Sequence, residues 1–231
     1  MPRSRRRDSE RPLVGTFMVI SFVLGALLGA VIATTWVQGL PVLQFSEGEN
    51  YARSITIVGI DKSTGEGRLA TITVELRGGT GRLLIAVPPY ENEDTQKAAL
   101  DARTAAGSKA GWGLKQTDVI ISIENLSTET TIAGPSSSAA VAVLIVAAIN
   151  AKDNKPLSMV HQNVVVSAAI DSTGRLKPVG DIAEKYRAVR AAEGYSVFVV
   201  AQDQPGHLPD YPDISVERAS DLDELASIVL W

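Results

Sequence analysis

Residues 133–152 read AGPSSSAAVAVLIVAAINAK, in which a Gly-Pro and three serines precede an unbroken run of small apolar side chains. This run is apolar on every face from Ala139 to Ile149, and its 11 residues are too few to span a bilayer. A helix without a polar face is buried inside a domain, and its alanines let other backbones approach closely. The stretch therefore predicts a central core helix that begins at the serines.

The segments on either side of this helix predict a domain of the α+β class. Residues 51–60 and 67–76 are rich in Thr, Ile and Val and flank the turn DKSTGEG, a pattern typical of a β-hairpin. Further strands are predicted at 81–90, 118–125, 163–171 and 196–201, and further helices at 91–111, 181–195 and 219–231, the last of them capped by Ser220. We expect mixed sheets with packed helices.

The N-terminal part of the chain predicts a membrane anchor. Residues 13–37 form a run of 25 residues without a charge, which is long enough to cross a bilayer. Residues 1–12 carry five arginines and two acids, a net charge of +3, and a basic flank on this side favours a cytoplasmic N-terminus. The prediction is a basic cytoplasmic tail at 1–12, a transmembrane signal anchor at 13–37, a linker at 38–50 and a domain at 51–231 on the extracytoplasmic side of the cell membrane.

A cleaved signal peptide is the alternative for the same segment. Such a peptide shares the basic start but needs an apolar region of only ~7–15 residues and a small-x-small cleavage site. The apolar run here is longer, and no convincing cleavage triplet ends it. The sequence therefore favours an uncleaved anchor.

Composition argues against several classes of function. The net charge is −4, so the chain after the +3 tail carries −7, and with 5% aromatic residues it offers no basic or stacking surface for nucleic acid. There is no cysteine, which excludes thiol nucleophiles and Cys-ligated metals. His161 and His207 lie far apart, without metal-ligand spacing, and no phosphate-binding Walker loop occurs. We expect no metal, no cofactor and no ATPase activity in this chain.

The serines at the start of the core helix are candidates for nucleophilic chemistry. A serine there lies beside free backbone N–H groups and the positive end of the helix dipole, which are the donors that an oxyanion needs. An inert helix start is the alternative, because Ser and Pro are common in the first turn of helices. A serine nucleophile also needs a base, and without a suitable histidine this would be a desolvated lysine, Lys177 or Lys185. An ordinary surface lysine paired with Glu184 or Asp181 is the alternative for Lys185.

Two stretches resemble the proteolytic domain of the Lon family of Ser-Lys peptidases. GPSSSAAVAV at 134–143 is similar to the family's Gly-Pro-Ser-Ala-Gly nucleophile motif. GRLKPVGDIAEKYRAVRAAE at 174–193 is similar to its Gly-Arg-x-x-Pro-Val-Gly-Gly-Ile-x-Glu-Lys motif. The resemblance runs from about Ser54 to Trp231 and implies a Lon-protease-like fold.

The resemblance also implies roles for individual residues. By this matching Ser136 is the nucleophile and Lys185 is the general base. Ser167 stands where the family has a threonine and would orient the lysine amine by a hydrogen bond. Backbone N–H groups of Ser136 and Ser137 would hold the oxyanion.

The chain departs from the family pattern at several positions. Ala133 and Ala169 replace acidic residues that the family carries, and Ser137 and Ser138 replace the usual Ala-Gly. The family's ATPase module has no counterpart. The expected function is therefore a membrane-anchored, ATP-independent serine endopeptidase that cleaves peptides or unfolded proteins, and the resemblance implies a homo-oligomer, with a hexameric ring as its form.

Two other functions are considered. One is a non-catalytic, membrane-tethered binding or scaffold domain that keeps a Lon-like fold but has lost activity, which the alanines at 133 and 169 would suit. The other is autocleavage that releases the domain from its anchor.

Overall fold

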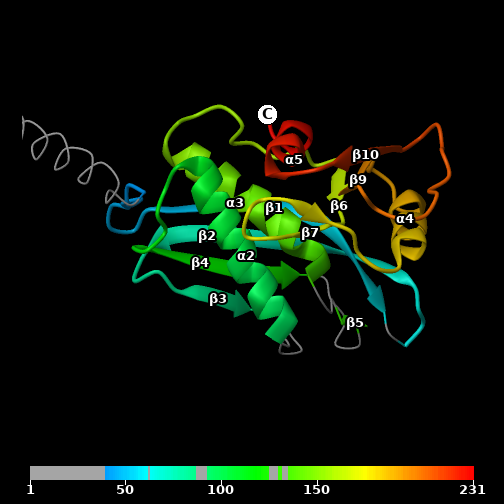
Figure 1. The fold of residues 1–231 in the computed structure, drawn as a ribbon, viewed down its shortest axis with the longest axis horizontal. Coiled ribbons are helices and arrows are strands. Elements are labelled where there is room, and N and C mark those ends of the chain that lie inside the picture. Colours follow the sequence, from blue (N-terminus) through cyan, green and yellow to red (C-terminus); the bar gives the residue numbers. More distant parts are fainter. Residues whose placement is uncertain (1–39, 62, 87–92, 125–129, 132–134) are drawn as a thin grey trace, which may run out of the picture. The chain divides into compact units, whose positions relative to one another are not determined.

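The structure is a computed structural model that describes residues 40–231 except 62, 87–92, 125–129 and 132–134 (Figure 1). The predicted tail and anchor, residues 1–37, lie outside the described residues.

Eight strands of the described chain form one mixed sheet in the order β10-β9-β6-β1-β2-β4-β3, and β5 also pairs with β1. Along that order β2 is antiparallel to both of its neighbours, and the other pairs are parallel. The strands are β1 (Asn50–Asp61), β2 (Gly67–Gly78), β3 (Leu83–Ala86), β4 (Thr117–Glu124), β5 (Thr130–Thr131), β6 (Val164–Val166), β9 (Val197–Ala201) and β10 (Ser215–Ala219). A separate two-stranded sheet joins β7 (Ala169–Ile170) to β8 (Leu176–Lys177). The predicted α+β class and the predicted hairpin are confirmed.

Helices cover both faces of the large sheet. Helices α2 (Glu93–Ala110), α3 (Ser138–Lys152) and α5 (Leu222–Val229) contribute to the larger hydrophobic cluster, whereas α4 (Ile182–Ala191) packs in a smaller one. Alternation along β1 explains the division, because Ile55 and Ile57 enter the larger cluster and Val58 enters the smaller one. Figure 1 shows α2 and α3 side by side in front of the sheet, with α4 apart from them.

Helix α3 is the central core helix that the sequence predicts. Every residue from Ala139 to Ile149 is buried, with at most 3% of its surface exposed. The segment Pro135–Lys152 is the one stretch among the described helices whose length and composition would suit a membrane span, and 67% of it is buried inside the domain. Its apolar character is therefore that of a core helix.

Two sequence predictions need correction. The strand predicted at 163–171 is two short strands, β6 and β7, because the chain leaves the large sheet after Val166 to pair with β8. The cap predicted at Ser220 is wrong, since the carboxylate of Asp221 accepts the N–H groups of Asp223 and Glu224 at the start of α5. Acidic caps of this kind satisfy helix N–H groups as well as serine does.

Strand β2 and helix α4 approach each other closely at Gly67, which has no side chain. A Cβ atom at Gly67 would lie 2.6 Å from the Ala188 Cβ atom and 2.8 Å from the Glu184 carbonyl oxygen. We expect Gly67→Ala to push α4 away from the sheet and to lower the free energy of unfolding by about 1–3 kcal/mol, the usual cost of overpacking.

Chemical denaturation measures this loss. Gly180→Ala is the matched control, because a Cβ atom there meets no atom within 4 Å and we expect unchanged stability. Equal stability of the two variants would contradict the close packing of α4 on β2.

Candidate active site

The serines at 136–138 do not act as a simple helix cap. Residues Pro135–Ser137 form a turn of 3-10 helix, and α3 begins at Ser138. Ser137 occupies the N-cap position, but its side chain makes no capping hydrogen bond. Ser136 is half-buried and precedes the first turn of α3. Capping of an inert helix therefore does not account for the hydroxyl groups of Ser136 and Ser137.

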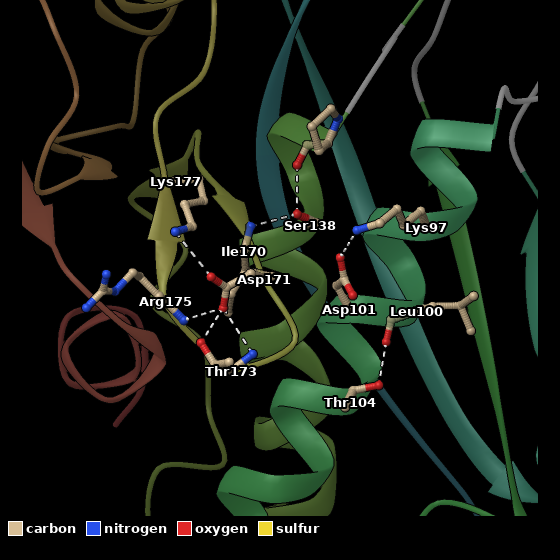
Figure 2. Close-up of polar contacts among 11 residues, drawn as sticks. Lys97, Leu100, Asp101, Thr104, Ser138, Ile170, Asp171, Thr173, Arg175 and Lys177 are labelled. Atoms are coloured by element: carbon tan, nitrogen blue, oxygen red, sulfur yellow. Dashed lines mark hydrogen bonds and ion pairs between the residues drawn. The ribbon is translucent and has the colours of Figure 1, made fainter.

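The third serine is itself buried and has two hydrogen-bond partners. Ser138 is 3% exposed, and its Oγ atom donates to the Pro135 carbonyl oxygen at 2.7 Å. The same oxygen accepts the N–H of Ile170 in β7 at 3.0 Å, a bond that Figure 2 shows. The 3-10 turn is thereby fastened to the small sheet.

Lys185 is a buried lysine on the first turns of α4. It is 5% exposed, and in the described part of the chain its amine has no hydrogen bond and no ion pair. Burial lowers the pKa of Lys185, and the charge of Asp181 opposes this shift in part. Glu184 pairs with Arg187 instead, at 2.6 Å. The alternative of an ordinary surface lysine paired with its neighbours is therefore wrong.

Ser167 is a buried hydroxyl without a partner. It is 1% exposed, and its Oγ atom is the buried side-chain polar atom that lacks a hydrogen bond among the described residues. Its N–H donates to the Val199 carbonyl oxygen, so it continues the pairing of β6 with β9. Ser167 directly follows β6, whose Val165 packs in the cluster that contains α4.

Strand β1 is the common neighbour of all three candidate residues. The 3-10 turn that contains Ser136 contacts β1, and so does α4, which carries Lys185. β6, which ends just before Ser167, pairs with β1 in parallel. The turn with Ser136 leads into α3, which packs in the larger cluster, whereas α4 packs in the smaller one, and β1 contacts both the turn and α4. No hydrogen bond joins any two of the three side chains within the described residues.

Lys177, the other candidate base, forms an ion pair with Asp171. Its amine lies 3.2 Å from a carboxylate oxygen of Asp171 and its side chain is 44% exposed (Figure 2). Burial raises the pKa of Asp171, but hydrogen bonds from Thr173, Arg175 and Lys177 outweigh burial and lower that pKa to about 2. Lys177 is engaged with a carboxylate, whereas burial lowers the pKa of Lys185, so Lys185 is the better candidate for a base.

The two histidines lie in loops, His161 before β6 and His207 after β9. The ring of His161 lies 6.2 Å from the ring of Trp231 near the C-terminus, and His207 follows Gly206 in a loop. Over the described residues, no group of three or more His, Cys, Asp or Glu side chains could hold a metal ion.

The comparisons with known proteins do not assign a family. No protein-family model matches the sequence, and a search of curated proteins finds no matching relative.

Two residues near the site have roles that the sequence did not predict. Asp181 precedes α4 with a φ of 55°, in the left-handed region that glycine adopts most easily. The left-handed backbone at this position could have been predicted from the resemblance, because Asp181 stands where the Lon-family motif has a glycine. Ser138 likewise appeared only as a departure from that motif, and no sequence pattern indicated its bond to Ile170.

Proposed function

We propose that this chain is a membrane-anchored, ATP-independent serine endopeptidase with a Lon-like proteolytic domain and a Ser-Lys dyad. One observation carries the proposal: among the described residues, Lys185 is a buried lysine without a hydrogen bond or ion pair, and Ser167 is a buried serine whose hydroxyl has no hydrogen bond. Burying an unpaired amine costs free energy, and such groups concentrate at functional sites. Ser136 lies in the turn that contacts their shared neighbour, β1.

The proposed mechanism uses Lys185 as a neutral base. Its lowered pKa favours an amine with a free lone pair, which takes the Ser136 hydroxyl proton as the oxygen attacks the peptide carbonyl. The N–H groups of Ser136 and Ser137 stabilise the oxyanion, and Ser167 Oγ accepts a hydrogen bond from the lysine. The protonated amine then gives its proton to the leaving amine, and water releases the acyl group with Lys185 again as the base.

The proposed cellular setting comes from the sequence. Residues 13–37 would anchor the chain in the cell membrane, with the peptidase domain on the extracytoplasmic side and an uncleaved N-terminus. The proposed substrates are short peptides, flexible tails or unfolded proteins. The resemblance to Lon proteases also supports assembly into a homo-oligomeric ring.

A fluorophosphonate probe tests the proposal, because it reacts with activated serines and leaves ordinary ones intact. We expect the full chain in detergent to be labelled without ATP, and peptide mapping to find the label on Ser136. Labelling should rise with pH as Lys185 loses its proton. An unlabelled chain with intact fold would overturn the peptidase assignment.

The non-catalytic binding or scaffold domain remains the second candidate. One observation favours it: the described residues contain no hydrogen bond between Ser136 and Lys185. The labelling experiment separates the two functions, since a scaffold domain has no activated serine.

The charge of Asp181 provides a prediction about pH. Peptidase activity needs neutral Lys185, so activity rises as pH passes upward through the pKa of this amine. Asp181 raises that pKa against the larger effect of burial. We therefore expect Asp181→Asn to lower the pKa and to move the rising limb of the kcat/KM profile to lower pH.

Asparagine is the appropriate replacement because it tolerates the left-handed backbone at this position. Glu193→Gln, beyond the other end of α4, is the control and should leave the profile in place. A profile that moves to higher pH, or does not move, would exclude Lys185 as the titrating base.

A further inference from the structure

The hydroxyl of Ser138 donates one hydrogen bond and accepts another. Its proton goes to the Pro135 carbonyl oxygen, and its lone pair takes the Ile170 N–H. Ser138 is 3% exposed and its bond to Ile170 is buried, so water does not compete for that bond. The hydroxyl therefore holds one defined orientation between the 3-10 turn and β7 (Figure 2).

The bond to Pro135 has a geometric effect on Ser136. The Pro135 carbonyl and the Ser136 N–H belong to one planar peptide unit, and in a trans peptide they point in opposite directions. Fixing the carbonyl oxygen therefore fixes the direction of the N–H. The pyrrolidine ring of Pro135 also restricts its φ angle, so the turn has little remaining freedom.

The segment that contains Ile170, to which Ser138 is bonded, is held by further hydrogen bonds. Ala139 N–H donates to the Ala168 carbonyl oxygen at 3.2 Å, which fastens α3 to the same segment that holds Ile170. The next residue, Asp171, accepts the N–H groups of Thr173 and Arg175, which closes the turn between β7 and β8. Ser138 is thus tied to a segment that cannot easily shift.

We infer that Ser138 is a positioning residue, whose hydroxyl fixes the Pro135–Ser136 peptide so that the Ser136 N–H is held as an oxyanion donor. The inference rests on the proposed peptidase function and adds a residue to it. It explains why a buried serine stands at 138, where the resembling family has glycine: the side chain makes the bond that orients the peptide.

A merely structural serine is the competing explanation, because Ser138 also satisfies the buried N–H of Ile170. A positioning role and a structural role of Ser138 differ in their effects on the tetrahedral adduct and on the bound, uncleaved peptide. An oxyanion donor stabilises the tetrahedral adduct and contributes little to the binding of uncleaved peptide. A structural contact affects the stability of the fold, and it changes the binding of peptide and of adduct together.

The experiment compares Ser138→Ala, Ser138→Cys and wild type as full chains. A peptidyl boronate forms a tetrahedral adduct on the nucleophile, and the matching peptide substrate gives kcat and KM. We expect Ser138→Ala to weaken boronate inhibition and to lower kcat, each about 10-fold, because the Ser136 N–H stays in place but loses its fixed direction, whereas outright loss of an oxyanion donor costs about 100-fold. KM should change by less than about threefold, and Ser138→Cys, a near-isosteric weak donor, should recover part of kcat.

Ser227→Ala is the matched control. Ser227 also donates to the carbonyl oxygen three residues before it, at 2.7 Å, but lies exposed on α5. Unchanged boronate affinity in folded Ser138→Ala, or equal loss of boronate and peptide binding, would overturn the inference and leave the peptidase function intact. If Ser138→Ala does not fold, Ser138→Cys carries the same test. Wild type that binds no boronate and cleaves no peptide would instead overturn the function, and the inference with it.

Discussion

We expect Ser136→Ala to eliminate the proposed turnover of unfolded casein and of short fluorogenic peptides, with kcat/KM falling at least about a thousandfold. The nucleophilic oxygen is lost, and the remaining oxyanion donors and substrate contacts give only residual catalysis. Ser136 is half-buried in a 3-10 turn that its own side chain does not stabilise among the described residues, so we expect the melting temperature to stay within about 2 °C of wild type. Turnover is measured on the full chain without ATP.

Ser227→Ala is the control for this variant and should retain full turnover, because its hydroxyl lies on the exposed face of α5. Turnover that survives in Ser136→Ala would remove Ser136 from the mechanism. A contaminating peptidase is recognised separately, by turnover that is equal in wild type, Ser136→Ala and Lys185→Arg.

Lys185→Arg is the second substitution with a large expected effect. Arginine keeps the positive charge and a long side chain but does not deprotonate in proteins, so it cannot accept the serine proton. We expect kcat/KM to fall at least about a thousandfold at every pH. Lys185→Met should be equally inactive, and it should remain folded because the site is already buried.

Lys177→Met separates the two lysines considered as bases. Lys177 is paired with Asp171, and we expect its replacement to leave a clear majority of the activity. Partial activity in Lys185→Arg would show that this residue acts through its charge alone. Loss of activity in Lys177→Met together with an active Lys185→Met would assign the base to Lys177.

The sequence predicts those parts of the fold that depend on local periodicity. The run of apolar residues after Ser138 defines α3, because only burial accommodates a helix without a polar face. The alternating Thr, Ile and Val of 51–60 and 67–76 define the hairpin of β1 and β2. β10 was missed because most of its residues are exposed, and its strand conformation comes from pairing with β9.

The arrangement of the candidate site could be predicted only in part. The resemblance indicated Ser136, Ser167 and Lys185 as candidates. The lowered pKa of Lys185 could not be predicted in this way, because its burial arises only when α4 packs against β2. The connection from Ser138 to Ile170 joins residues 32 positions apart, and no local pattern encodes such a contact. Long-range hydrogen bonds of single side chains appear only once the chain is folded.

The division of the core into two hydrophobic clusters bears on when the protein can act. Ser136 adjoins α3 in the larger cluster, and Lys185 belongs to α4, which packs with the smaller one on the opposite face. Smaller clusters open at lower free energy than the core of a domain. For the proposed peptidase, a partly opened chain would therefore carry Ser136 without its base, and docking of α4 would complete the catalytic site.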